Sequence, residues 1–239
     1  MRAVSLAPSA TNVLAALDAE DRLVGRTTHC SADAPAVGGW LNPDYEAVAD
    51  RDPDVVLTSD DLQAEIRDDL RDRGFDVHHV EPATLDDVLT SFTAIGAAIE
   101  LPERGEALEA DCRERVDAVR QRAPENTDER PVVYCEEWAD PPMAAGNWVP
   151  DAVEAAGGRY PFVPAGERSR EVDPEVVREA APEHAVVHVC GTGDQTDADP
   201  AARWDLDAAV HVVDDSLLNQ PSPRLVDGIE HLAGLLRED

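Results

Sequence analysis

The segment Glu46–Leu57, EAVADRDPDVVL, and the segment Glu175–Val187, EVVREAAPEHAVV, carry one pattern in the two halves of the chain. In each, a proline stands seven residues after a glutamate, and an acidic residue and an apolar run follow the proline. Asn42-Pro43 and Asp173-Pro174 stand just before, in the order of an N-cap and a proline at the first helical position. The pattern predicts a short helix, a proline stop and a buried strand, once per half. We therefore expect two similar α/β lobes with equivalent loops facing a ligand cleft.

The remaining segments of the chain also alternate between predicted strands and predicted helices. This alternation is typical of largely parallel sheets covered by helices on both faces. Strands are expected at residues 3–6, 23–25, 55–58, 77–80, 132–135, 185–189 and 210–213, and helices at 12–17, 45–49, 62–73, 85–99, 151–156 and 224–236.

One predicted helix, residues 101–123, is long and amphipathic. Pro102 stands at its start, and its apolar residues recur at helical spacing among Glu, Arg and Asp. We therefore predict an N-terminal α/β lobe (1–100), a connecting helix (101–124) and a C-terminal α/β lobe (125–239), both lobes Rossmann-like with parallel sheets.

The charge of the chain restricts its partners. Asp and Glu total 51 against 20 basic residues, all of them arginine, for a formal net charge of −31. Such self-repulsion is tolerable where counter-ions are abundant, which indicates a halophilic source. It disfavours nucleic acid and anionic membrane surfaces as partners. Because 43% of residues are hydrophobic and occur in periodic runs, the chain is expected to fold.

Location and redox state are less constrained. The four cysteines show no C-x-x-C spacing, so no structural zinc site is expected, and disulfides cannot be assigned. No apolar run reaches transmembrane length, so no direct membrane insertion is expected. Met1 leads directly into a predicted strand without a signal peptide. The sequence as written predicts a cytoplasmic protein, or an extracellular one if an export signal was removed.

Aromatic residues mark the candidate ligand site. Several fall in or beside loops between strands and helices, where open α/β sheets bind ligands, and together they indicate a flat, apolar ligand held between the lobes. Local packing under a loop is the alternative for each one. The loop aromatics are Trp40, Tyr45, Trp138, Trp148, Tyr160 and Phe162.

Signals for catalysis are few. The chain has no G-x-S-x-G, H-E-x-x-H or Walker A sequence and no lysine. The histidines show no paired metal spacing, so we expect no metal site and no catalytic residues. His29 lies in a loop close in sequence to Trp40 and is a candidate ligand contact, whereas His188 and Cys190 are expected to be packed or surface residues.

Glu46 and Glu175 recur at matching positions. A carboxylate in a first helical turn is stabilised by the helix dipole and needs no partner. The dipole alone does not explain the matching positions in both lobes. A two-fold symmetric partner could contact one glutamate per lobe.

Two groups of motifs resemble one known family. In the first half these are Arg2–Thr11, Leu23–Thr27 and Val37–Trp40, and in the second half Glu136–Pro142, Gly146–Trp148, Gly157-Gly158 and Ser222–Leu225. They are similar to the vitamin B12 (cobalamin)-binding proteins, which are substrate-binding subunits of ABC importers. The match covers nearly the whole chain. The family fold is two α/β lobes joined by one rigid helix.

The resemblance implies a non-enzymatic binding protein for cobalamin or a related corrinoid, with the corrinoid as ligand and no catalytic cofactor. Trp40 would line the corrin pocket, and His29 falls where relatives carry a pocket aromatic and could be an axial cobalt ligand. The two glutamates that dock a membrane permease map onto Glu46 and Glu175. The full set of expected ligand contacts is Ser9, His29, Trp40, Trp138, Trp148 and Arg224.

Two departures from the family and two alternative functions remain open. A pocket tryptophan of some relatives is replaced near Arg168 and Ser169, and without an export signal the chain could be a cytosolic corrinoid carrier. A haem or ferric-siderophore receptor is the second reading, although anionic siderophores would need an arginine-lined cleft. A corrinoid-modifying enzyme using His29, His188 or Cys190 is the third.

Overall fold

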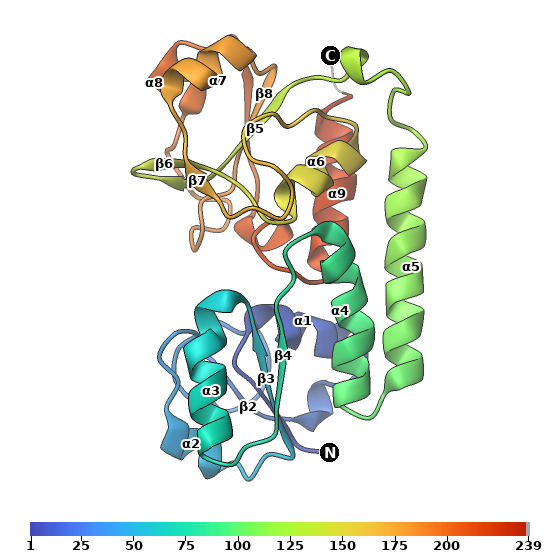
Figure 1. Cartoon of the computed structure of the whole chain (residues 1–239), viewed down its shortest axis with the longest axis vertical. Coiled ribbons are helices and arrows are strands. Elements are labelled where there is room, and N and C mark those ends of the chain that lie inside the picture. Colours follow the sequence, from blue (N-terminus) through green and yellow to red (C-terminus); the bar gives the residue numbers. More distant parts are fainter. Residues whose placement is uncertain (238–239) are drawn as a thin grey trace. The chain divides into compact units, whose positions relative to one another are not determined.

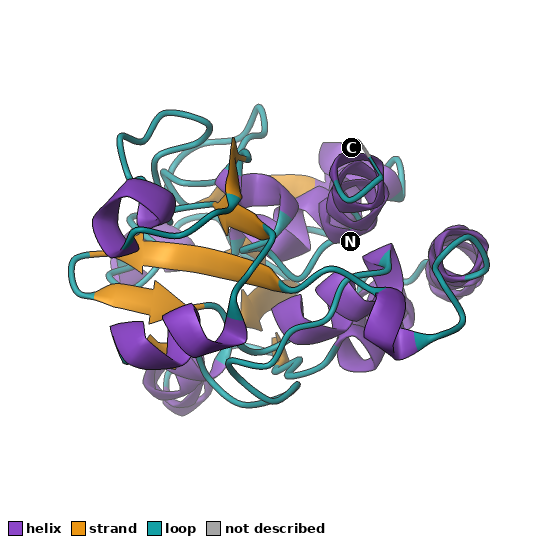
Figure 2. Cartoon of the chain, turned by 90° about the horizontal axis from the view of Figure 1, so that it is seen from above, coloured by secondary structure: helices purple, strands orange, loops and turns teal. Residues whose placement is uncertain are grey.

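The computed structural model describes residues 1–237, which form two compact α/β units. Unit 1 contains Met1–Pro82 and Asp86–Cys112, and unit 2 contains Ala83–Leu85 and the chain from Arg113 onward. Helices and strands alternate along the chain, as the sequence predicts (Figure 2). The predicted α/β class with two mostly parallel sheets is confirmed. The exact domain boundaries expected from the sequence stay a prediction.

Unit 1 contains a four-stranded, fully parallel sheet in the order β2-β1-β3-β4 (Figure 1). Its central strands are short apolar runs buried on both faces, as the strands of a parallel sheet covered by helices must be. The strands are β1 (Ala3–Ser5), β2 (Leu23–Arg26), β3 (Val55–Ser59) and β4 (Val77–Val80), and the helices are α1 (Pro8–Ala16), α2 (Tyr45–Ala49), α3 (Ala64–Asp72) and α4 (Leu85–Ala98).

A core cluster packs the helices onto this sheet. Val4 and Val56 of the two central strands contact Ile66 and Leu70 of α3 within it, and Phe75 packs against its margin. Residues four apart on a helix lie on one face, which explains why Ile66 and Leu70 both point inward. Burying such aliphatic side chains contributes about 1.5–3 kcal/mol each.

Unit 2 contains a five-stranded sheet in the order β7-β6-β5-β8-β9. β5, β8 and β9 are parallel, whereas β6 and β7 are antiparallel and were not predicted. The strands are β5 (Val133–Ala139), β6 (Pro142–Ala144), β7 (Arg170–Glu171), β8 (His184–Val187) and β9 (Ala209–Val212), and the helices are α6 (Val149–Ala156), α7 (Pro174–Ala180), α8 (Pro200–Trp204) and α9 (Arg224–Leu235).

An aromatic group and an ion pair fill the core of unit 2. The ring of Tyr134 makes edge contacts with Phe162 and Trp204, both at 5.3 Å between centroids. Glu136 is fully buried and accepts two hydrogen bonds from the guanidinium of Arg203, at 2.6 and 3.1 Å. A buried carboxylate is tolerated only when it is paired in this way.

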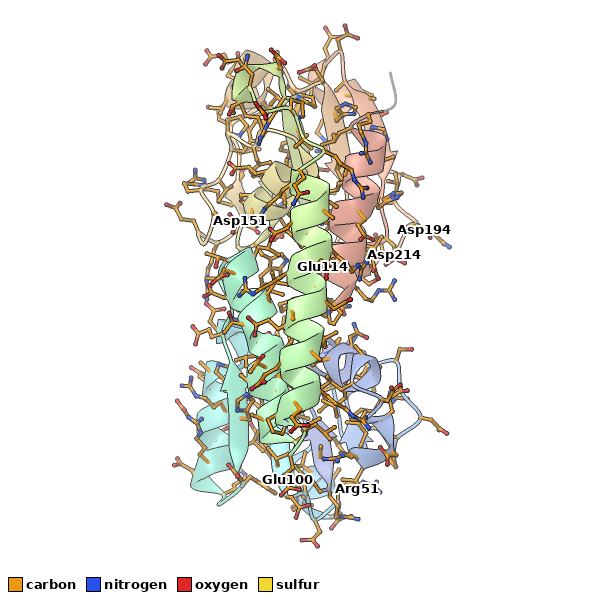
Figure 3. The ribbon with its side chains drawn as sticks, turned by 90° about the vertical axis from the view of Figure 1, so that its right-hand side faces the viewer. Arg51, Glu100, Glu114, Asp151, Asp194 and Asp214 are labelled. Carbon is orange, nitrogen blue, oxygen red and sulfur yellow. The ribbon has the colours of Figure 1, made fainter. Side chains whose placement is uncertain are left out.

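α5 (Pro102–Arg120) contributes residues to both units. In unit 1, α4 and α5 approach closely at Gly96 and Gly105, where a Cβ on Gly105 would lie 2.9 Å from the Phe92 carbonyl oxygen. In unit 2, Arg115 forms ion pairs with Asp227 and Glu230 of α9, at 2.6 and 2.7 Å. Polar side chains such as Glu114 line the exposed face of α5 (Figure 3), so the predicted amphipathic helix is confirmed.

The short segment Ala83–Leu85 belongs to unit 2 because α6 holds it there. The backbone N–H of Leu85 donates to Oδ2 of Asp151 at 3.0 Å. α4 therefore begins on one unit and continues through the other.

The predicted helix at 45–49 is confirmed as α2, but its predicted N-cap, Asn42 with Pro43 as first helical residue, is wrong. The helix begins at Tyr45, and its N-cap is Asp44, whose Oδ1 accepts the N–H groups of Glu46 and Ala47 at 3.0 Å. Asn42 and Pro43 remain in the preceding loop. In the second half the prediction is correct, because Asp173 caps α7 and Pro174 is its first residue.

Among residues 1–237, no helix has the length and apolar character that crossing a bilayer requires.

His188 lies fully buried just after β8. Its ring pairs with the side chain of Asn219, and the amide of Asn219 donates to the His188 carbonyl at 3.0 Å. Burial lowers the pKa of His188 to about 4, and the hydrogen bond to Asn219 partly opposes that shift. The imidazole is therefore neutral at pH 7.

This burial predicts acid destabilisation. The folded-state pKa lies below the ordinary value of 6.5, so the unfolded chain binds more protons between pH 6.5 and 4. The free energy of unfolding should fall as pH drops through that window, by about 2 kcal/mol at pH 5 from this group. Urea unfolding at pH 7 and pH 5, in constant molar KCl, measures the change. In His188→Gln, the change in the free energy of unfolding between pH 7 and pH 5 should be smaller by that amount. In the exposed control His231→Gln, it should equal the wild-type change. The same change in all three proteins would contradict the account.

Candidate ligand-binding site

The carboxyl ends of parallel strands face one edge of each sheet, and the loops that follow them form what we call the carboxyl edge of that unit. In unit 1, Ser9 lies in the first turn of α1 directly after β1, and His29 and Trp40 lie in the long loop between β2 and α2. The structure therefore brings these three predicted residues to the same edge. Ser9 is buried, Trp40 is half-buried and His29 is exposed.

The side chain of Gln63 organises this edge. Its oxygen accepts the N–H of Ser59 at the end of β3, at 2.9 Å. Its nitrogen donates to the carbonyl of Leu6 after β1, at 2.9 Å, and to that of Trp40, at 2.7 Å. Gln63 is fully buried, so losing its side chain would remove a hydrogen bond from each of these three backbone groups.

The loop that carries Trp40 is tightly folded. Gly38 has a φ of +104°, and a Cβ there would lie 2.5 Å from the backbone nitrogen of Asp44. The loop closes through Gly39 N–H to Asn42 O, at 3.1 Å, and Thr28 N–H to Gly38 O, at 2.9 Å. The glycines before Trp40 therefore allow the chain to reverse there, and the Trp40 backbone is fixed on both sides.

In unit 2, the carboxyl edge gathers groups from β5, β8 and the segment before α9. Trp138 near the end of β5 is 46% exposed, and its indole N–H donates to the Asp140 carbonyl at 2.9 Å. Glu137 follows Glu136 on the same strand, and its carbonyl accepts the Cys190 N–H at 3.0 Å. The exposed thiol of Cys190 thus lies beside the strand that carries Trp138.

Burial shifts the pKa of several titratable groups of this edge toward their uncharged forms. Burial raises the pKa of the Glu137 carboxyl, with a smaller opposing effect from its hydrogen bond to Ser169. Burial and the carboxylate of Asp215 raise the pKa of the Cys190 thiol, which is therefore protonated at neutral pH. His188 is neutral as well. Neither the protonated Cys190 thiol nor the buried neutral His188 is set up as a nucleophile or a base.

Two other predicted ligand contacts in unit 2 differ in exposure. Arg224, the first residue of α9, is exposed. Trp148 is buried to 4% exposure, and its indole N–H donates to the Leu218 carbonyl at 2.7 Å. Its ring is part of the interior, as the packing alternative predicts. The role of Arg224 in ligand binding stays a prediction.

The predicted group of loop aromatics separates into two sets. Tyr160 and Phe162 are buried and contact each other at 5.4 Å between ring centroids, so they belong to the core of unit 2. Trp40, Tyr45 and Trp138 retain exposed surface. A loop between elements can pass under the surface of a domain, and the sequence alone does not separate the two cases.

The sequence did not reveal Gln63, Glu137 or Ser169 as part of these edges. Ser169 lies near the position where some relatives carry a pocket tryptophan. Its hydroxyl accepts the Gly146 N–H at 2.8 Å. A glutamine in a helical pattern and a glutamate beside another glutamate carry no distinctive signal. Their importance comes from strand ends that lie close only in the fold.

Glu46 and Glu175 occupy equivalent local positions. Each is the second residue of a short helix, and the carboxylate of the preceding aspartate N-cap accepts its backbone N–H, at 3.0 and 2.9 Å. Both side chains are exposed. Glu175 also pairs with Arg178, one turn later, at 2.5 Å. The geometry leaves both carboxylates available at the surface of their own unit.

The chain is similar in sequence and in fold to known binding proteins. The chain is 26% identical to a cobalamin-binding protein of Halobacterium salinarum, over 97% of this chain and 68% of that one. Its fold is similar to that of the periplasmic vitamin B12-binding protein of Vibrio cholerae, at 21% identity and a TM-score of 0.80, over 99% and 96% of the two chains. It is also similar to the periplasmic haem-binding protein of Vibrio cholerae, at 19% identity and a TM-score of 0.80, over 100% and 99%.

A family model covers most of the chain. The model described as Periplasmic binding protein matches residues 4–202, which include unit 1 from Val4 onward, the loop that carries Trp40 and the strand that carries Trp138. The chain belongs to the periplasmic binding protein family.

Proposed function

We propose that the chain binds cobalamin or a related corrinoid, without catalysis, and delivers it to an ABC-type membrane permease. The observation that carries the proposal is the half-buried Trp40, held on a rigid loop at the carboxyl edge of unit 1. An aromatic ring fixed in this way can stack on a flat macrocycle without paying for loop ordering. The relatives named as cobalamin- and vitamin B12-binding support the choice of ligand.

The chemistry of unit 2 supports an uncharged ligand. Corrinoids present amide groups around a flat ring, whereas haem and siderophores present carboxylates or other anionic groups. The Cys190 thiol, protonated at neutral pH, and the Glu137 carboxyl, whose pKa is raised by burial, suit amides better than anionic groups. Arg26, the cation nearest His29 in sequence, is engaged by the carbonyls of Ala32 and Thr27, at 2.8 and 2.9 Å. Haem remains the second candidate because of the similar haem-binding folds.

The same observations support binding rather than catalysis. The Nδ1 side of the His188 ring is taken by Asn219, and the Cys190 thiol is protonated at neutral pH. Neither group is activated as a base or nucleophile. His29 is exposed, and a role as axial ligand to cobalt stays a prediction.

We place the proposed site of action outside the cytoplasm. The family is described as periplasmic binding proteins, and the similar vitamin B12- and haem-binding proteins of Vibrio cholerae are periplasmic. A corrinoid receptor that serves a permease acts on the side from which the ligand arrives. The high acidity of the chain is compatible with a salty medium.

Trp40→Ala tests the ligand and the site together. We expect the wild-type protein to bind one cyanocobalamin per chain, and the variant to bind more weakly by about 1–3 kcal/mol, typical of losing an aromatic anchor. Calorimetry in molar KCl measures both, with haemin as a parallel ligand. Val176→Ala, which removes exposed apolar surface from α7, is the matched control and should bind normally. No binding of cyanocobalamin to the wild type overturns the proposed ligand, and haemin binding alone supports the second candidate. Equal affinity in Trp40→Ala limits the failure to the site.

A second prediction concerns delivery. Replacing Glu46 and Glu175 together with alanine should leave cyanocobalamin affinity unchanged and abolish capture by a corrinoid ABC permease in nanodiscs, because rim charges govern association with a partner. The control is Glu65→Ala with Glu179→Ala, two exposed helical carboxylates, one per unit, that remove the same charge. If both double variants are captured equally, the dipole explanation of Glu46 and Glu175 is preferred.

A further inference from the structure

The two strands at one side of the unit 2 sheet carry a pair of facing histidines. His184 is the first residue of β8, and His211 is opposite Val186 in the parallel register, so both imidazoles lie on the same face of the sheet. Nδ1 of His184 lies 3.0 Å from Nε2 of His211, and the rings are nearly parallel, at 26°. One ring of the pair donates an N–H to the other, and both are half-buried.

The 3.0 Å spacing between these nitrogens is also compatible with binding of one metal ion by both rings. An imidazole nitrogen binds a divalent transition metal at about 2.0–2.1 Å. If two nitrogens 3.0 Å apart each bind one ion at about 2.0–2.1 Å, the angle between the two bonds at the ion is about 90°. A tetrahedral ion needs about 109° and therefore nitrogens about 3.4 Å apart. A right angle is the geometry of square-planar and tetragonal copper(II) and nickel(II).

We propose that His184 and His211 form a two-histidine chelate for copper(II) or nickel(II), separate from the ligand-binding carboxyl edges. For chelation both rings would have to turn from the N–H···N alignment of their hydrogen bond until both lone pairs converge on the ion. The donating ring moves its proton to its other nitrogen through solvent, so both imidazoles bind as neutral ligands with no net proton release. Burial, and then the neighbouring His211, lower the pKa of His184, which keeps that ring neutral at neutral pH.

The surroundings favour an open, water-completed site. Within the part of the chain that the structure describes, no cluster of three or more His, Cys, Asp or Glu side chains is arranged to hold a metal ion. The carboxylate of the adjacent Glu183 is engaged by the Val132 N–H at 3.1 Å. Water therefore completes the coordination, and the net charge of −31 attracts cations to the surface.

The position of the pair gives the chelate a structural consequence. β9 is an edge strand, and its Val210 and Val212 are 37% and 40% exposed. An ion held by one histidine from each strand would cross-link β9 to β8. Because the unfolded chain does not hold the two rings together, binding stabilises the folded state.

Electron paramagnetic resonance of bound copper(II) tests the site directly. We expect one tetragonal copper(II) per chain with hyperfine structure from two nitrogens, measured in a Cys190→Ser background in molar KCl, since the exposed thiol would otherwise compete. His184→Asn and His211→Asn should each abolish the two-nitrogen signal, and the double variant should be no worse than either. His231→Asn, on the exposed face of α9, should keep it.

Thermal unfolding supplies a readout that needs no substitution in the pair. Nickel(II) should raise the melting temperature of the wild-type protein more than calcium(II) at equal concentration. Calcium prefers oxygen ligands and reports only the screening of carboxylates. A copper signal without nitrogen coupling, one that persists in His211→Asn, or equal effects of nickel and calcium would each overturn the proposal and leave a hydrogen-bonded histidine pair.

Discussion

The buried amide of Gln63 is the constraint on which the carboxyl edge of unit 1 depends. One side chain satisfies backbone groups from the end of β3, from the segment after β1 and from the loop that carries Trp40. An unmade buried hydrogen bond costs about 1–3 kcal/mol, so the three segments are held in one arrangement. Trp40 lies at this edge because Gln63 holds its backbone carbonyl, and its ring remains partly exposed.

Unit 2 fixes its edge by the same means. The hydroxyl of Tyr160 donates to the Ala145 carbonyl at 2.7 Å, and the indole of Trp148 donates to the Leu218 carbonyl at 2.7 Å. Asn219 bonds both the ring and the backbone of His188. Buried side chains thus hold the loops, and Trp138 and Cys190 remain at the surface. This division explains why only some aromatics next to loops are available to a ligand.

The sequence predicts the architecture well because periodicity is a local property. The apolar runs at Val55–Leu57 and Ala185–Val187 are short, flanked by proline on one side, and can be read without knowledge of the fold. The antiparallel strands β6 and β7 were missed because Pro142–Ala144 and Arg170–Glu171 are too short to show alternation. The N-cap of α2 was misassigned because asparagine and aspartate are both good N-caps and Asn42 is followed by a proline, whereas the structure caps the helix with Asp44.

The site was predicted less completely, for a physical reason. Trp40, His29 and Ser9 follow recognisable strands, so their common edge follows from the rule for parallel sheets. The roles of Gln63, Ser169 and Asn219 depend on which strand ends meet, and the interior position of Trp148 depends on packing across 70 residues. The His184–His211 pair likewise requires the register of β8 with β9.

Hydrogen–deuterium exchange with and without cyanocobalamin tests the central claim most directly, because it reports where the ligand lies on the folded chain. The account predicts protection in the loop 27–44 and after β1 in unit 1, and around residues 137–148 in unit 2, with α2 and α7 unchanged. Protection confined to other elements, or none at saturating ligand, would contradict the claim that the carboxyl edges hold a corrinoid.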